Sequence, residues 1–306
     1  MIGIGAIACE IPEARASNRD LMSRFGVDEN FLVQKIGVLE RAIMPIDSKT
    51  SDLCIAAAQR LFATGIVRPR DVQCVVVVTQ NPDGSGLPHT SAIVHGALGL
   101  DLHCSTFDIS LGCSGYVHAL SIVGSFMAAN ELTSGLLFTA DPYSKVVDPA
   151  DRDTAMLFGD AGTVTLLTAD PIWKIGKFDF GTSGERHDML QVDASHVLRM
   201  NGRGVFTFCA TEVPQSIHRV LQRNELNLDG VDRIVLHQGS KYIVDTIGNR
   251  LNAHGKTSFY ATRYGNCVSS SIPLILAQNL GPSDRCVVIS GFGVGLTWAS
   301  TVLTRQ

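Results

Sequence analysis

The sequence contains no Cys-x-x-Cys pair, although eight cysteines are spread along its 306 residues. Without closely spaced cysteines, neither a zinc site nor the dense disulfide framework of a small secreted domain is indicated. Dispersed cysteines are typical of reducing compartments, where a free cysteine packs as a small apolar residue. The cysteine pattern therefore predicts a cytoplasmic protein without a metal site.

Long apolar runs and basic clusters are also missing. No stretch approaches the roughly 20 apolar residues that a membrane-spanning helix needs. Residues 1–9 are apolar, but no basic segment accompanies them and the run ends at Glu10, so they are predicted to form a strand and not a signal peptide. The net charge is −4 and no basic stripe occurs, which argues against nucleic acid as a partner. We therefore expect neither a membrane nor a nucleic-acid partner.

Short runs of β-branched residues alternate with longer helix-like segments. Continuous short apolar runs indicate strands that are buried on both faces, and their alternation with helices predicts an α/β fold with a mostly parallel sheet. The predicted strands are residues 75–78, 106–109, 135–139, 162–167, 234–236 and 287–289, and the predicted helices are residues 51–64, 90–98, 114–130, 212–224, 241–252 and 270–280.

The order of these features repeats along the chain. In each half a β-branched strand precedes a glycine-containing turn, the turn opens a helix, and a glycine-rich apolar stretch ends the half. The two turns are residues 112–115 and 265–266. We therefore predict two α/β halves, residues 1–170 and residues 171–306. Packing of the halves by a pseudo-twofold axis would bring the two turns together at the centre.

Cys113 is the candidate nucleophile. It lies in a turn between a strand-like run and a helix-like segment, with Gly112 and Gly115 on either side. Such an elbow places a side chain at a helix N-terminus, where unpaired amides and the helix dipole favour a thiolate over a thiol. The other cysteines that we considered, Cys54, Cys74 and Cys104, lack this context and are interpreted as packing residues.

His237 and Asn266 are the candidate partners of Cys113. His237 ends a strand-like run, the usual location of a site in an open α/β sheet, although a buried structural histidine is the alternative. Asn266 follows Gly265 in a turn, where asparagine is ordinary by itself. A neutral imidazole beside a carboxamide would supply two uncharged donors to a developing enolate oxygen. The second half is thus predicted to complete the site.

The segment 291–298 reads Gly-Phe-Gly-Val-Gly-Leu-Thr-Trp. It lacks a phosphate-loop lysine and does not open a dinucleotide-binding unit, which argues against a nucleotide site. Its glycines would let backbone amides approach a reacting thioester carbonyl, and an ordinary glycine turn is the alternative.

Taken together, these segments resemble the thiolase superfamily, and specifically the β-ketoacyl-ACP synthase III group. The resemblance extends over nearly the whole chain and implies duplicated thiolase-like α/β halves in a five-layered α-β-α-β-α core. The segments that carry it are residues 2–5, 36–41, 107–115, 148–152, 158–160, 237–238, 265–266 and 292–298.

The resemblance implies an acyltransferase with a covalent intermediate. Cys113 would accept an acyl group from acyl-CoA, with the backbone amides of Cys113 and Val294 as oxyanion hole. His237 and Asn266 would bind the malonyl thioester of malonyl-ACP or malonyl-CoA and stabilise the enolate formed on loss of carbon dioxide. A decarboxylative Claisen condensation would then give a β-ketoacyl product. Coenzyme A thioesters are substrates in this scheme, and no metal or other cofactor is expected.

The resemblance also implies binding residues and a partner subunit. Phe31 and Arg152 match positions that hold the adenine of coenzyme A. Leu87 matches a residue that reaches from one subunit into the acyl pocket of the other, which implies a homodimer, with a heterodimer as the alternative. The other implied roles are the lining of the acyl pocket by Leu87, Phe158, Phe206 and Leu296, and the binding of acyl carrier protein by Lys241 and Arg250.

Departures from the family pattern keep other functions open. Val294 takes the middle place of a usual triple glycine, and a β-branched residue resists positive φ. Phe31 replaces a tryptophan and Lys35 an arginine. One alternative is therefore transfer of the acyl group from Cys113 to an oxygen or nitrogen nucleophile of a secondary metabolite. A non-catalytic partner subunit of a heterodimeric synthase is less expected, because the three candidate residues are present. A hydroxymethylglutaryl-CoA synthase reaction is disfavoured because residues 80–86 contain no glutamate.

Overall fold

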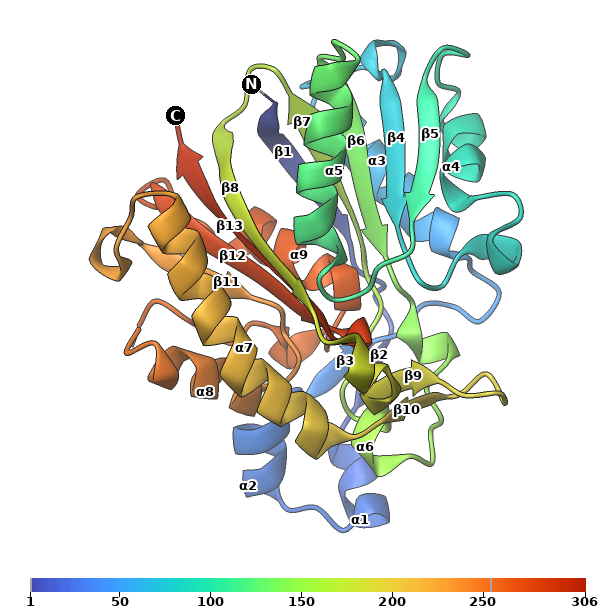
Figure 1. The fold of residues 1–306 in the computed structure, drawn as a ribbon. Coiled ribbons are helices and arrows are strands. Elements are labelled where there is room, and N and C mark those ends of the chain that lie inside the picture. The colour runs from blue at the N-terminus through green and yellow to red at the C-terminus, as the bar shows by residue number, and fades with distance from the viewer. Residues whose placement is uncertain (1, 254) are drawn as a thin grey trace.

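The computed structural model describes residues 2–253 and 255–306. Its main sheet has nine strands in the order β11-β12-β13-β8-β1-β7-β6-β4-β5 (Figure 1). The bounds of these strands are β1 Gly3–Glu10, β4 Cys74–Val78, β5 Ser105–Ile109, β6 Ser134–Ala140, β7 Gly162–Thr168, β8 Trp173–Thr182, β11 Arg233–Leu236, β12 Cys286–Gly293 and β13 Thr297–Arg305. The sheet consists of two strand sets, the first formed by β1, β7, β6, β4 and β5 and the second by β8, β13, β12 and β11. The two sets meet at β1 and β8, which pair through Ile4 and Trp173.

The same pattern of pairing occurs in both strand sets. β4 and β6 are parallel, whereas β7 is antiparallel to both β6 and β1. Likewise, β11 and β12 are parallel, whereas β13 is antiparallel to both β12 and β8. β5 extends the first set by pairing in parallel with β4. In the second set, Ile234 N of β11 donates a hydrogen bond to Lys256 O at 2.8 Å. The prediction of a mostly parallel sheet is wrong, because five of the eight strand pairings in the main sheet are antiparallel.

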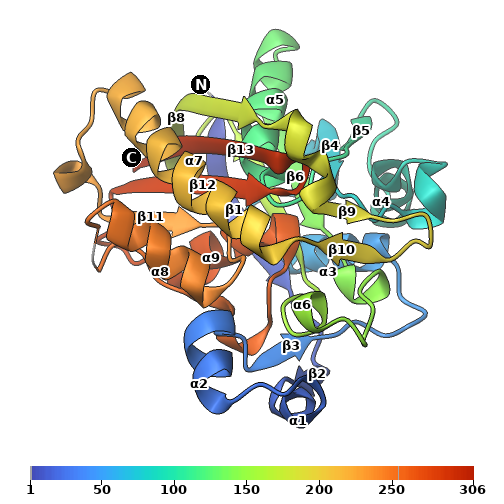
Figure 2. The same ribbon diagram turned by 60° about the horizontal axis from the view of Figure 1, so that its bottom comes forward.

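Helices form three layers around the two strand sets (Figures 1 and 2). α5 (Gly115–Ala129) and α9 (Ser271–Asn279) share an apolar cluster with strands of both sets and form the central layer. α3 (Thr50–Ala63) and α4 (Thr90–Leu98) cover the other face of the first set. α7 (Gly202–Arg223) and α8 (Lys241–Arg250) cover the other face of the second set. The fold is therefore the predicted five-layered α-β-α-β-α arrangement.

The side chains of β4 explain this layering. Val76 and Val78 pack in the cluster of α5 and α9, whereas Val75 and Val77 pack against the α3 side. Successive side chains of a strand point to opposite faces of the sheet. A strand covered on both faces must then be apolar throughout, which is why this one is a continuous valine run.

The smaller elements lie together in the lower part of Figure 1. They are β2 (Arg15–Ser17) paired with β3 (Glu40–Ala42), β9 (Leu190–Val192) paired with β10 (Leu198–Met200), and the short helices α1 (Met22–Phe25), α2 (Glu29–Phe31) and α6 (Arg152–Ala155). In the described part of the chain, none of the helices combines the length and the apolar character needed to cross a bilayer.

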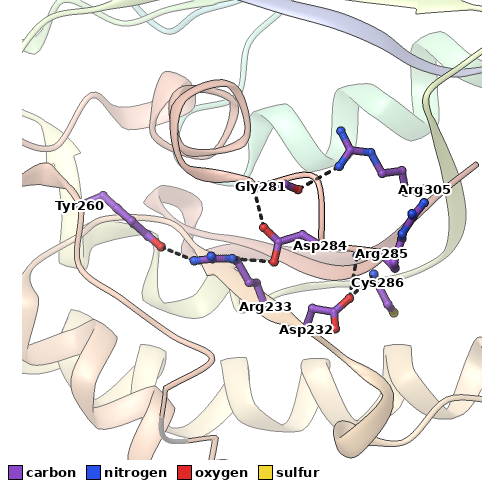
Figure 3. A network of polar contacts seen from close by, with 8 residues as sticks. All are labelled: Asp232, Arg233, Tyr260, Gly281, Asp284, Arg285, Cys286 and Arg305. Carbon is purple, nitrogen blue, oxygen red and sulfur yellow. Dashed lines mark hydrogen bonds and ion pairs between the residues drawn. The ribbon is translucent and has the colours of Figure 1, made fainter.

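A polar network fixes the chain that flanks β11 (Figure 3). Arg233 donates hydrogen bonds to Asp284 at 2.8 Å and to the Tyr260 hydroxyl at 3.2 Å. The backbone N–H of Tyr260 in turn donates to Gln238 Oε1 at 2.7 Å. Because Gln238 follows His237 directly, this network helps to set the position of the candidate histidine.

α7 begins ten residues earlier than the predicted start at residue 212. Proline is usual in the first turn of a helix, but Pro214 lies in the middle of α7. Proline has no N–H to donate to the carbonyl of Ala210. Arg250 Nη1 of α8 donates to that carbonyl instead, at 2.7 Å. The arginine therefore replaces the missing helical hydrogen bond and ties α8 to α7.

Arg250→Met is expected to lower the free energy of unfolding by about 1.5 kcal/mol, because the Ala210 carbonyl loses a charge-assisted hydrogen bond. Methionine keeps the apolar stem, so the change isolates the guanidinium. Chemical denaturation would measure the loss. Arg70→Met is the control, since the exposed Arg70 side chain makes no hydrogen bond within the described residues. An equal loss in both variants would contradict the assignment.

Candidate active site

A cavity of about 400 Å³ lies where the two halves meet, and Cys113, His237 and Asn266 all line it. Their exposed fractions are only 4%, 3% and 3%. The first half supplies the thiol, and the second half supplies the imidazole and the carboxamide. Three side chains that are remote along the chain therefore share one buried space.

Cys113 lies in a tight turn between β5 and α5, where Gly115 N donates to Gly112 O at 2.7 Å. A Cβ at Gly112 would lie 2.5 Å from Gln80 Oε1, so only glycine fits before the cysteine. A Cβ at Gly293 would lie 2.8 Å from Cys113 Sγ, so the end of β12 passes directly beside the sulfur. The glycines thus allow the backbone to approach the candidate nucleophile from two sides.

Val294 fits this loop without backbone strain. Among the described residues, the positive φ angles of the loop fall on Gly293 (156°) and Gly295 (108°), and not on Val294. The conformation that a β-branched residue resists is therefore adopted by the glycines on either side. The departure from a triple glycine is compatible with a backbone donor at this position.

Burial raises the pKa of the Cys113 thiol to about 12. Backbone hydrogen bonds of Val294 and of Cys113 itself oppose this rise, and the charge of Asp141 adds to it. Burial opposes the predicted preference for a thiolate, because the loss of hydration disfavours the anion more than the backbone hydrogen bonds stabilise it. Cys113 is a neutral thiol at ordinary pH, so its proton needs an acceptor during reaction.

His237 is a neutral imidazole directly after β11. Its backbone N–H donates to Ser290 O at 2.9 Å, and its ring packs edge-on against Phe292 with centroids 5.6 Å apart. Burial lowers its pKa to about 3, against the opposing effect of a backbone hydrogen bond with Val268. Nδ1 has no hydrogen-bond partner within the described residues. A neutral ring can accept a proton at one nitrogen and donate from the other.

Asn266 is fixed through its backbone and its side-chain oxygen. Its N–H donates to Leu157 O at 2.8 Å, and its carbonyl accepts from Gly159 N at 3.1 Å. Asn266 Oδ1 accepts from Val268 N at 2.9 Å and from Ser271 Oγ at 3.4 Å. The oxygen is thus engaged on the protein side, which leaves Nδ2 as the donor that this side chain offers to the cavity.

Cationic and aromatic side chains line the exposed end of the cavity. The Arg152 guanidinium lies over the Phe31 ring, 5.3 Å from its centroid, and Lys35 Nζ lies 3.5 Å from the centroid of Tyr242. Tyr242 stacks on Phe206, with ring centroids 5.0 Å apart. Phe31, Arg152 and Phe206 were among the predicted residues. These groups give the exposed end both positive charge and flat apolar surfaces.

Several predicted binding residues lie elsewhere. Phe158 does line the cavity, but Leu296 is fully buried in the apolar cluster of the second half and does not. The Leu87 side chain is 88% exposed, outside the cavity of its own chain. The two predicted carrier-binding cations are both engaged within the chain, since Lys241 pairs with Asp245 and Arg250 donates to α7.

One wall of the cavity was not predicted from the sequence. It consists of the first turns of α7 and of the β9–β10 pair. The residues concerned are Leu190, Met200, Arg203, Val205 and Cys209. Arg203, Phe206 and Cys209 are spaced three apart and so lie along one face of a helix. That signal was hidden because the predicted helix began after them.

Two α/β halves in five layers, with a cysteine on an elbow facing a histidine and an asparagine from the other half, define an enzyme of the thiolase-fold condensing class. Two family models match this chain. 3-Oxoacyl-[acyl-carrier-protein (ACP)] synthase III matches residues 107–184, and its C-terminal counterpart matches residues 221–305. The chain belongs to the 3-oxoacyl-[acyl-carrier-protein] synthase III family.

Similar proteins agree with this assignment over their whole length. Beta-ketoacyl-[acyl-carrier-protein] synthase III of Streptococcus pneumoniae serotype 19F (strain G54) is 31% identical over 321 aligned residues, which cover 98% of each chain. The crystal structure of 3-oxoacyl-(acyl carrier protein) synthase III from Pseudomonas aeruginosa PAO1 has a TM-score of 0.91 and 31% identity, covering 99% of this chain and 98% of that one. A further 3-oxoacyl-(acyl-carrier-protein) synthase III structure has a TM-score of 0.92 and 31% identity over 99% of both chains. The predicted family and fold class are confirmed.

Proposed function

We propose that this condensing enzyme transfers an acyl group from acyl-CoA to Cys113 and then condenses it with malonyl-ACP or malonyl-CoA, with loss of carbon dioxide, to give a β-ketoacyl product. The observation that carries the proposal is the convergence of Cys113, His237 and Asn266 on one buried cavity. The names of the relatives support an acyl carrier protein as one substrate carrier.

In the first step, Cys113 Sγ attacks the thioester carbonyl of acyl-CoA. The bond from that carbonyl to the coenzyme A sulfur breaks, and the coenzyme A thiolate takes the proton that Cys113 gives up. The neutral imidazole of His237 can relay this proton, because its pKa of about 3 leaves a nitrogen lone pair available. The N–H groups of Cys113 and Val294 stabilise the oxyanion.

In the second step, His237 and Asn266 donate hydrogen bonds to the thioester carbonyl oxygen of the malonyl group. The bond to the carboxylate carbon breaks, carbon dioxide leaves, and the electron pair forms an enolate held by the two neutral donors. The enolate carbon attacks the acyl-Cys113 carbonyl. The carbon–sulfur bond to Cys113 then breaks, and the thiolate takes a proton from the solvent.

The exposed end of the cavity suits coenzyme A. Arg152 and Lys35 offer charge to its phosphates, and the Phe31 ring offers a face to its adenine. Lys241 and Arg250 would meet an acidic carrier protein there, although Arg250 is already engaged by Ala210 O. The chemistry proposed uses only protein groups and needs no metal or redox cofactor.

We also propose that the enzyme is a dimer. Among the described strands, β5 is at the edge of the sheet and pairs with β4 alone, so its other edge can pair with a second copy of the chain. The exposed Leu87 side chain lies on the loop after β4, where it can reach the acyl pocket of that partner. A heterodimer with a related chain would use the same edge.

The release of carbon dioxide tests the second step. Incubation with an acyl-CoA and carboxyl-labelled malonyl-ACP or malonyl-CoA is expected to release one labelled carbon dioxide for each β-ketoacyl product, because condensation and decarboxylation are coupled. Omission of the acyl-CoA is the control for uncoupled loss. Acyl turnover without carbon dioxide release would overturn the proposal and favour transfer to an oxygen or nitrogen nucleophile.

A further inference from the structure

Asp141 is a fully buried carboxylate at the junction of the two halves, one residue after β6. Its Oδ1 accepts hydrogen bonds from Gln80 N at 2.7 Å and from Thr79 Oγ1 at 3.3 Å, both in the first half. Its Oδ2 accepts from Ser269 Oγ of the second half at 2.5 Å. A single carboxylate therefore bridges the two halves close to the site.

Ser269, which bonds Asp141, belongs to the same turn as Asn266. Val268, the residue before Ser269, has a φ of 50°, which is a strained conformation for a β-branched residue. In the same turn, Val268 N donates a hydrogen bond to Asn266 Oδ1 at 2.9 Å. The hydrogen bond between Ser269 and Asp141 holds the next residue of the turn in place. The orientation of the Asn266 amide thus depends on a turn that Asp141 stabilises.

Gln80, whose backbone N–H bonds Asp141, also lies close to the turn that contains Cys113. Gln80 Oε1 lies against Gly112, the residue before the nucleophile, and also accepts a hydrogen bond from Tyr143 OH at 3.2 Å. Burial raises the pKa of the Cys113 thiol, and the charge of Asp141 raises it further. Asp141 therefore acts on the backbone around Cys113 and on the electrostatic potential at its sulfur.

We propose that Asp141 is a positioning residue for both steps of the reaction: its carboxylate fixes the turn that orients Asn266 and sets the potential at Cys113. The part that concerns Asn266 rests on the proposed function, whereas the part that concerns Cys113 does not. Asp141 does not line the cavity, so it acts through these neighbours.

Within the described residues, the titratable groups whose pKa responds to the charge of Asp141 are neutral. Cys54 of α3, Cys113 and Tyr143 each have a pKa raised by burial, and Asp141 adds to the rise in all three. Burial also raises the pKa of Asp141 itself to about 7, against its hydrogen bonds with Ser269, Gln80 and Thr79. Above that pH the carboxylate is ionised, and a nearby negative charge disfavours a thiolate.

The first test removes the charge with Asp141→Asn and follows the alkylation of Cys113 by iodoacetamide at alkaline pH. The rate profile is expected to shift to lower pH, because loss of the neighbouring charge lowers the thiol pKa. Asp160→Asn is the matched control. Asp160 is equally buried and accepts hydrogen bonds from Met44 N and Ser144, but it does not act on Cys113. An unshifted profile for Asp141→Asn, or an equal shift for Asp160→Asn, overturns the proposal.

The second test uses Ser269→Ala to remove the hydrogen bond from Ser269 Oγ to Asp141 Oδ2. Malonyl decarboxylation is expected to fall on the order of 10²-fold, because a small displacement of Asn266 is costly, while acylation of Cys113 persists. Ser269→Thr keeps the hydroxyl and is expected to restore the rate. Ser216→Ala removes another buried serine, which bonds Ser300 at 2.8 Å and does not line the cavity, and controls for the loss of a buried hydroxyl.

A parallel loss of acylation and decarboxylation in Ser269→Ala would indicate a merely structural role and overturn the proposal, as would unchanged decarboxylation. Thermal melting establishes that each variant is folded, and the Asp141→Asn profile decides alone if Ser269→Ala does not fold. Wild-type protein that never decarboxylates malonyl thioesters would overturn the proposed function instead. The alkylation profile would still test Asp141 in that case.

Discussion

Cys113→Ala is expected to abolish the covalent labelling that radiolabelled acyl-CoA produces in the wild-type protein. The sulfur is the group in the cavity to which an acyl chain can be transferred next to the backbone donors of Cys113 and Val294. Loss of such a nucleophile lowers turnover by at least about 10³-fold. Intact-protein mass spectrometry after exposure to a panel of acyl-CoAs measures the added mass and also identifies the preferred donor.

Cys104→Ala is the matched control for this experiment. Cys104 is another buried thiol, placed directly before β5 and outside the cavity lining, so its loss is expected to leave the label intact. Equal labelling of wild type and Cys113→Ala would place the acyl group elsewhere. Since Cys209 also lines the cavity, digestion and peptide mapping would show whether that second thiol had taken the label.

Asn266→Ala is expected to keep acylation of Cys113 and to lose malonyl decarboxylation by about 10²- to 10³-fold, the usual effect of removing one donor to a developing oxyanion. Its side-chain oxygen is engaged by Val268 N and Ser271 Oγ, so the lost group is the N–H donor directed to the cavity. Single-turnover labelling measures the first step, and release of labelled carbon dioxide measures the second.

Asn227→Ala provides the control for Asn266→Ala. Asn227 is an exposed asparagine whose side chain accepts a hydrogen bond from Gly230 N at 3.0 Å in a surface turn, so neither step should respond to its loss. An equal fall of acylation and decarboxylation in Asn266→Ala would contradict a specific role in enolate stabilisation.

The parts of the fold that could be predicted are those with a strong local signal. The valines of β4 indicate a strand buried on both faces, and residues 90–98 form α4 as predicted. The elbow around Cys113 has glycines at the positions where a Cβ would collide. The site residues could be proposed because their flanking segments match a known family, while their convergence depends on tertiary structure.

The parts that could not be predicted depend on distant partners. β8 contains Gly176 and Gly181, which weaken a strand signal, but a Cβ at Gly181 would lie 1.9 Å from the Trp298 ring. Pro214 in the middle of α7 is tolerated because Arg250 bonds the carbonyl that proline leaves free. The high pKa of Cys113 likewise follows from its depth in the fold, which no local pattern reveals.

The meeting of the strand sets at Ile4 and Trp173 has a wider consequence. The candidate site residues come from both halves, so turnover requires that the two halves are correctly packed against each other and not only that each half is folded. During refolding, circular dichroism should recover before activity does. A small molecule that binds between the two strand sets and displaces them is expected to inhibit the enzyme without contacting Cys113 Sγ.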